Sequence, residues 1–153
     1  MSVPSLIASA VGSWEGPSKL HLSWLAEDER IQESHSTLTI KLDPNSVFAT
    51  LEYTWAYQGE TQYGTILLAG YADAQACSMG WSDSWHQGTG VLHLVGTFSN
   101  DKVSGLGEYT YEGSDPFGWR IDLTMTGEQL QLTMTNIPPD GEEWAVDALY
   151  SRV

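Results

Sequence analysis

Asp83 is the residue whose neighbours in the sequence point most clearly to chemistry. It stands at the centre of Trp81-Ser82-Asp83-Ser84-Trp85, and alternate residues of a strand share one face, so its carboxyl group is predicted to lie between two tryptophans. Burying an unpaired carboxylate is costly. We therefore expect Asp83 to accept hydrogen bonds from Ser, Tyr or Trp groups, to pair with an arginine, or to lie near a wet opening. A structural contact and a ligand-orienting or acid–base role are both compatible with this position.

Aromatic side chains accompany Asp83 on the inward faces of the predicted strands. The sequence holds seven Trp and seven Tyr, residues that combine a large apolar surface with a polar group. We predict a ligand-binding set made of Asp83 and seven aromatic residues: Tyr53, Trp55, Tyr57, Trp81, Trp85, Trp119 and Trp144. Small barrels are often filled by their own side chains, so a packed core is the alternative. Because a barrel of about ten strands encloses more volume than one of eight, we expect a cavity for a flat, apolar or aromatic molecule.

The other residues that could support catalysis or bind a metal are scattered along the chain. Cys77, the single cysteine, falls on an apolar face, which is typical of a buried thiol. Gly80-Trp81-Ser82-Asp83 is not a nucleophile elbow, since no helix follows it. The histidines fall singly on different strands or turns, without the spacing of a metal site: His21 and His35 on outward faces, His86 and His93 elsewhere. We therefore predict no metal, no cofactor and no nucleophilic catalysis.

Acidic residues dominate the charge of the chain. Twenty Asp and Glu stand against six Lys and Arg, for a net charge of −14. Nucleic-acid binding requires a basic surface, and an anionic membrane repels an acidic protein, so we expect neither partner. Residues 1–11 contain no Lys or Arg and too short an apolar run for a signal peptide, and no window approaches the ~18 apolar residues of a membrane span. These features predict a soluble, cytoplasmic protein.

The elements that must position these side chains are short alternating runs separated by Gly, Pro, Asn and Asp. Ten such runs are predicted as strands: 14–24, 31–42, 47–58, 61–69, 76–85, 91–98, 102–111, 119–126, 129–136 and 144–152. Their regular spacing and tight turns favour an all-β fold, a single up-and-down antiparallel β-barrel. A short N-terminal helical turn is predicted to cover one end. Because no composition break divides the chain, residues 1–153 form one predicted domain.

The last predicted strand places an arginine on its apolar face. The even positions of this strand are Trp144, Val146, Ala148, Tyr150 and Arg152. A guanidinium stacked on an indole is stabilising by about 0.5–2 kcal/mol. We expect Arg152 to stack on Trp14, close to Gly12 at the start of the first strand, and so to close one end of the barrel.

Three stretches, in order along the chain, carry a resemblance to a known family. They are Gly12-Ser13-Trp14-Glu15-Gly16; Trp81-Ser82-Asp83-Ser84-Trp85 followed by Gly88-Thr89-Gly90 and Gly96; and Phe117-Gly118-Trp119-Arg120 before Ile121-Asp122-Leu123. In these stretches the chain resembles an uncharacterised bacterial domain-of-unknown-function family with a calycin-like β-barrel, related in shape to lipocalins, fatty-acid-binding proteins and nitrobindins. The resemblance implies a closed barrel and a structural Trp–Arg pair. Haem, as carried by nitrobindins, is not expected, because the last strands contain no histidine to ligate the iron.

Together these features predict a non-catalytic protein that binds a small apolar or aromatic molecule inside a barrel. Two alternatives remain open. One is a small barrel enzyme, an isomerase or lyase, that uses Asp83 with an inward Tyr or Arg. The other is a filled barrel that serves as an interaction module. The sequence predicts neither the identity of the ligand nor the oligomeric state.

Overall fold

The computed structural model describes residues 3–71, 74–87 and 90–153, and it contains ten strands and one short α-helix. The helix is α1 (Ser5–Ser9), and a 3-10 turn, η1 (Glu27–Glu29), lies between the first two strands. The strands are β1 (Gly12–His21), β2 (Ile31–Leu42), β3 (Phe48–Tyr57), β4 (Glu60–Tyr71), β5 (Ala76–Asp83), β6 (Leu92–Phe98), β7 (Lys102–Tyr109), β8 (Phe117–Thr126), β9 (Gln129–Ile137) and β10 (Glu143–Arg152).

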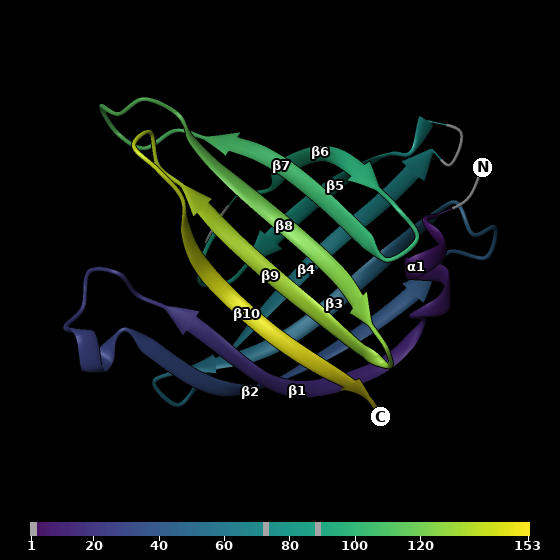
Figure 1. Cartoon of the computed structure of the whole chain (residues 1–153), viewed down its shortest axis with the longest axis horizontal. Coiled ribbons are helices and arrows are strands. Elements are labelled where there is room, and N and C mark those ends of the chain that lie inside the picture. Colours follow the sequence, from purple (N-terminus) through teal and green to yellow (C-terminus); the bar gives the residue numbers. More distant parts are fainter. Residues whose placement is uncertain (1–2, 72–73, 88–89) are drawn as a thin grey trace.

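The ten strands form one closed barrel (Figure 1). Each strand pairs antiparallel with its neighbours in the sequence, and β10 pairs with β1 to complete the circle. Closure gives every strand a hydrogen-bonded neighbour on both sides and leaves no exposed edge. The predicted up-and-down barrel is confirmed. Within the central motif of the resemblance, Gly88 and Thr89 lie outside the described residues.

Alternation of apolar and polar residues explains why these segments are strands. In β3, Ala49, Leu51, Tyr53 and Trp55 are buried while the residues between them are not. A two-residue turn then joins β3 to β4, with Gln58 at φ 50° and Gly59 at φ 80°. Two successive positive φ values match the right-handed twist of a hairpin. The turn therefore comes one residue earlier than the predicted Gly59-Glu60 turn, and Glu60 pairs with Tyr57 as the first residue of β4.

The helix α1 covers one end of the barrel, called here the closed end. Figure 1 shows α1 beside this end, and its Leu6 and Ile7 are buried as part of the core. The indole of Trp14 is buried beneath the helix, and its Nε1–H donates a hydrogen bond of 2.8 Å to the carbonyl of Ala10. Among the described residues, no helix is long and apolar enough to cross a membrane.

Arg152 fastens this closed end. Its guanidinium lies 4.3 Å above the Trp14 ring, which is the stack expected from the pattern of the last strand. Its Nη1 and Nη2 donate hydrogen bonds of 2.8 Å to the carbonyls of Val11 and Ser9, just after and within α1. One side chain from the last strand therefore ties the helix and the first strand together.

The two glycines that bound the Gly12–Gly16 motif are required by the geometry of this end. Gly12 has φ +130°, a conformation that residues with a side chain rarely adopt. At Gly16, an added Cβ would stand 1.9 Å from the carbonyl oxygen of Leu149 on β10, so only glycine permits this approach of β1 and β10. The opening motif thus serves the closure of the barrel.

Candidate functional site

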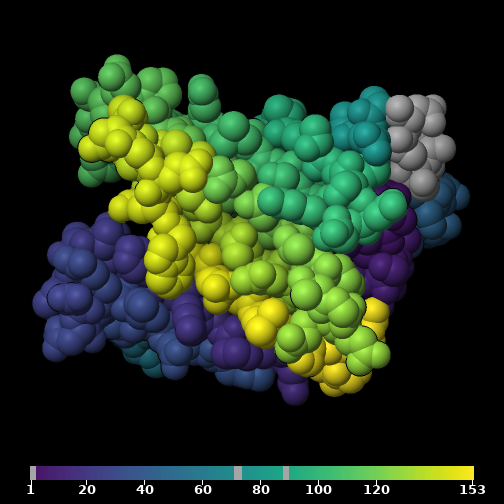
Figure 2. All heavy atoms as spheres, in the orientation of Figure 1, coloured from purple at the N-terminus to yellow at the C-terminus, as the bar shows by residue number. Residues whose placement is uncertain are grey.

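The opposite end of the barrel, called here the mouth, opens into a cavity of about 440 Å³. Figure 2 shows the surface hollowed at this end, between the purple-blue β1–β2 connection and the yellow β9–β10 connection. The walls come from β1, β5, β7, β8, β9 and β10 and from the segments that follow β1, β5 and β7. Aromatic residues dominate these walls: Trp24, Trp81, Trp85, Tyr109, Tyr111, Trp119 and Trp144.

The middle of the barrel is filled. The enclosed space there measures only about 10 Å³, which is about the room needed for one water molecule. Tyr53, Trp55 and Tyr150 are buried and border this space with their rings. Of these two spaces, only the one at the mouth is large enough for a ligand. The predicted cavity in the barrel interior is corrected, because buried side chains fill the volume that ten strands enclose.

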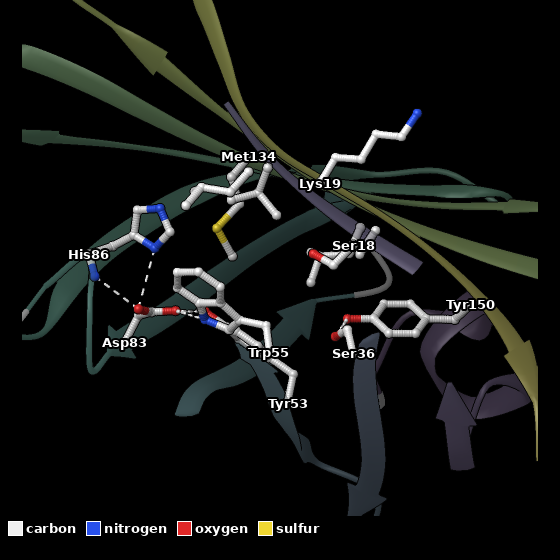
Figure 3. Close-up of a pocket in the computed structure, with 13 residues that line it drawn as sticks. Ser18, Lys19, Ser36, Tyr53, Trp55, Asp83, His86, Met134 and Tyr150 are labelled. Carbon is white, nitrogen blue, oxygen red and sulfur yellow. Dashed lines mark hydrogen bonds and ion pairs between the residues drawn. The ribbon is translucent and has the colours of Figure 1, made fainter. Parts of the chain in front are cut away.

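Asp83, the last residue of β5, lines the small interior space beside His86, which also borders the mouth cavity (Figure 3). Its Oδ2 accepts a hydrogen bond of 2.6 Å from the Tyr53 hydroxyl and one of 3.3 Å from Trp55 Nε1. Trp81 Nε1 in turn donates to the Tyr53 hydroxyl oxygen at 2.9 Å. Residues of β3 and β5 thus form a hydrogen-bonded network that runs from the Trp81 indole through the Tyr53 hydroxyl to the Asp83 carboxylate.

The second carboxylate oxygen of Asp83 organises the turn after β5. Oδ1 accepts backbone N–H hydrogen bonds from Trp85 at 2.8 Å and His86 at 2.9 Å. An aspartate that accepts from the backbone two and three residues later stabilises a tight turn, which is why the chain reverses at this point. The expectation that Asp83 accepts hydrogen bonds from Tyr and Trp groups is met.

These contacts determine the ionisation of the network. Burial alone would raise the pKa of Asp83, but the contacts from His86, Tyr53 and the His86 backbone N–H outweigh it and lower the pKa to about 2. Burial and the neighbouring carboxylate raise the pKa of Tyr53 well above its usual value. At neutral pH, Asp83 is therefore an anion that accepts hydrogen bonds and Tyr53 a neutral donor.

His86 is a residue of this site that the sequence reasoning missed, as it missed Trp24, Tyr109 and Tyr111 of the cavity wall. The turn folds its ring back among four indoles, with centroid distances of 5.6 Å to Trp55, 5.9 Å to Trp81, 4.8 Å to Trp85 and 5.4 Å to Trp119. Its Nδ1 lies 3.3 Å from Asp83 Oδ1, an ion-pair distance at which the two groups are misaligned for a hydrogen bond. His86 lines both the small interior space and the mouth cavity, so it separates them. The signal for this placement is its position three residues after a turn-forming aspartate.

The structure gathers most of the predicted aromatic set around His86. Trp81 and Trp119 stack face to face, with centroids 5.0 Å apart and an interplanar angle of 9°. Trp85 packs edge-on against Trp55 at 5.7 Å and against Tyr57 at 5.5 Å. The Nε1–H of Trp119 is buried and has no hydrogen-bond partner among the described residues. Trp81, Trp85 and Trp119 thus form the inner wall of the mouth cavity.

Trp144 does not point into the core as its even position in the last strand predicts. A β-bulge between Trp144 and Val146 shifts the alternation, so Ala145 is buried while Trp144 is 37% exposed. Trp144 stacks instead on His21, with ring centroids 4.6 Å apart, and His21 Nδ1 lies 2.9 Å from the Trp144 carbonyl oxygen. Trp144 still borders the mouth cavity, but from its outer rim.

The remaining candidate residues stand apart from the mouth. His35 is exposed and lies 3.7 Å from Glu15 on the outer surface, and His93 is exposed on β6. Cys77 is buried, and burial raises the pKa of its thiol. In residues 3–71, 74–87 and 90–153, no three His, Cys, Asp or Glu side chains converge in a way that could hold a metal ion.

Comparisons with known proteins agree with this fold. The crystal structure of Rv2717c from M. tuberculosis superposes with a TM-score of 0.64 over 100% of this chain and 99% of that one, at 13% sequence identity. Identity this low shows a shared fold alone. No curated protein matches the sequence. A family model described as protein of unknown function, DUF1579, matches residues 4–152, and the chain therefore belongs to this family.

Proposed function

We propose that the protein binds a small, flat, apolar or aromatic molecule in the mouth cavity, without catalysing a reaction. The observation that carries the proposal is a hollow of about 440 Å³ with aromatic walls, next to an interior with no room for a ligand. Ligand pockets typically enclose about 300–1,000 Å³ and have mainly apolar linings with a few polar groups. The mouth cavity has this size and this composition.

The exposure of the rim supports a ligand that covers it. Trp24 is 70% exposed and Trp144 37% exposed, although both border the cavity. Covering apolar surface is favourable by about 25 cal/mol per Å². A planar ring system in the cavity would cover these indoles.

The ionisation of Asp83 favours binding over catalysis. An acid with a pKa of about 2 has no proton to donate at neutral pH and is a weak base. Both oxygens already accept hydrogen bonds from the protein itself: Oδ2 from Tyr53 and Trp55, and Oδ1 from the backbone N–H of His86. We therefore assign Asp83 the role of holding the aromatic wall and His86 in place.

Native mass spectrometry of freshly purified protein tests this proposal, with a bound small molecule as the expected result. A titration with N-phenyl-1-naphthylamine, a neutral fluorescent probe, locates the site. Trp144→Ala is expected to weaken probe binding by about tenfold, since one side of the cavity is lost. Tyr63→Ala removes an exposed aromatic residue on the outer face of β4 and serves as the matched control. Equal effects of the two substitutions, or no probe binding by the unmodified protein, would contradict the proposal.

A further inference from the structure

We propose that the mouth cavity selects a planar aromatic cation over a neutral or anionic molecule of the same shape. The inference rests on the proposed binding function and adds the charge of the ligand. Three independent features carry it: the ring faces in the walls, the carboxylate at the rim, and the charge of the surrounding loops.

Trp and Tyr supply seven of the sixteen residues that border the cavity. Five of the seven tryptophans border it. The face of an aromatic ring carries partial negative charge and attracts a cation within about 6 Å of the centroid, most strongly when the ring is Trp. Trp24 and Trp144 are the exposed tryptophans of this set, and a planar cation would stack on them and gain this attraction together with the burial of its apolar surface.

The contacts of His86 show which groups surround a nitrogen heterocycle at this site. Its imidazole is held among four indoles with Asp83 Oδ1 3.3 Å from Nδ1. The fold thus already combines aromatic rings on several sides with one carboxylate. A ligand stacked on the outer part of the same wall would meet a second carboxylate in a matching arrangement.

Glu143, the first residue of β10, supplies that second carboxylate at the rim of the cavity. Asn136 Nδ2 donates to Glu143 Oε1 at 3.2 Å, and Asn136 Oδ1 accepts a hydrogen bond from the Tyr109 hydroxyl. All three residues border the cavity. The pKa of Tyr109 is raised by burial and by the charge of Glu143, which shows that this carboxylate acts on the cavity wall.

Positive charge is scarce around this cavity. Its described lining residues include neither Lys nor Arg. The three connections next to it, residues 22–30, 110–116 and 138–142, hold seven Asp and Glu and a single basic residue, Arg30. Arg30 Nε donates to the Leu25 carbonyl at 2.8 Å, and Arg120 on β8 is engaged with Asp122 at 3.1 Å and Glu142 at 2.8 Å. An anionic ligand would meet repulsion here, and a cation attraction.

Three probes of one shape and different charge test the inference by equilibrium dialysis: N-methylquinolinium, 1-methylnaphthalene and 1-naphthoate. We expect the cation to bind at least about tenfold more tightly than the neutral probe, and the anion to bind most weakly. Glu143→Gln should weaken binding of the cation by about threefold or more and leave the neutral probe nearly unchanged. Glu128→Gln, in the β8–β9 turn at the closed end, is the matched control and should change neither.

The outcomes separate the inference from the function on which it rests. Neutral binding as tight as cation binding would overturn the charge preference and leave the binding function standing. Equal effects of Glu143→Gln and Glu128→Gln would also overturn it, because the attraction would not come from the rim. Failure of all three probes to bind would overturn the proposed function and, with it, the inference.

Discussion

The two ends of the barrel use similar residues in opposite ways. At the closed end, Trp14 is buried, its N–H is bonded to a backbone carbonyl, and Arg152 stacks on it while bonding to two more carbonyls. At the mouth, tryptophans again surround a charged group, Asp83, but some of their surface faces a hollow. A tryptophan beside a charge stabilises the fold where the chain covers it, and we propose that it binds a ligand where the chain leaves it open.

The largest effect is expected from Asp83→Asn. The substitution removes the charge that four donors share and places an amide N–H₂ among them, so the free energy of unfolding should fall by about 3 kcal/mol in urea denaturation. Asp147→Asn is the control, since that carboxylate is half-buried and accepts one side-chain hydrogen bond, from Gln131. A loss no greater than that of the control would show that the network at the mouth contributes little.

Acid should weaken the protein through the same carboxylate. The pKa of Asp83 is about 2 in the folded protein and 3.8 ordinarily, so its contribution is fully present above 3.8 and is lost as the pH falls toward 2. The loss amounts to on the order of 2 kcal/mol. Measured from pH 5 to 2, the free energy of unfolding should decline more steeply in the unmodified protein than in Asp83→Asn. An equally steep decline in both proteins would contradict the lowered pKa of Asp83.

Arg152→Ala is expected to lower the free energy of unfolding by about 1–2 kcal/mol, because the stack on Trp14 and two hydrogen bonds are lost. Binding of N-phenyl-1-naphthylamine at the other end should be unchanged. Arg152→Lys keeps the positive charge but lacks the planar guanidinium, so its free energy of unfolding should lie between those of the unmodified protein and Arg152→Ala. Reduced probe affinity at unchanged stability would place the binding site at the closed end.

The smallest effect on stability is expected from Trp144→Ala, at under about 1 kcal/mol, since this ring packs on His21 at the half-exposed rim. Trp144→Ala should reduce probe affinity more than it reduces stability. Thermal unfolding and the probe titration on the same preparation measure both. Arg152→Ala should therefore lower stability without changing probe affinity, whereas Trp144→Ala should mainly lower probe affinity.

The fold and the closed end were predictable because both depend on local alternation. The strand pattern alone identifies the barrel, and the parity of β10 places Arg152 over Trp14. The same alternation gives the wrong face for Trp144, because a β-bulge inserts one residue there. No residue type in the sequence indicates this bulge. Trp24 ends the predicted strand 14–24 but is exposed, because β1 ends at His21.

The site was predictable only in its composition. The sequence indicates that Asp83 lies among tryptophans, and the structure gives it hydrogen bonds from Trp55 and from the Trp85 backbone. Trp81, Trp85 and Trp119 surround His86 instead. Whether the interior is open depends on how rings from distant strands fill it, which no local pattern records. The placement of His86 depends on a turn that Asp83 stabilises through backbone hydrogen bonds. Its ring contacts form only once the closed barrel brings together side chains from the non-adjacent strands β3, β5 and β8.

The seven tryptophans allow a direct test of where a ligand binds. Each indole N–H gives one NMR signal, and single Trp→Phe substitutions assign it. On titration with N-phenyl-1-naphthylamine, we expect the signals of Trp85, Trp119 and Trp144 at the mouth to shift together, while that of Trp14 at the closed end stays in place. A shift of Trp14 without the mouth signals would contradict the account.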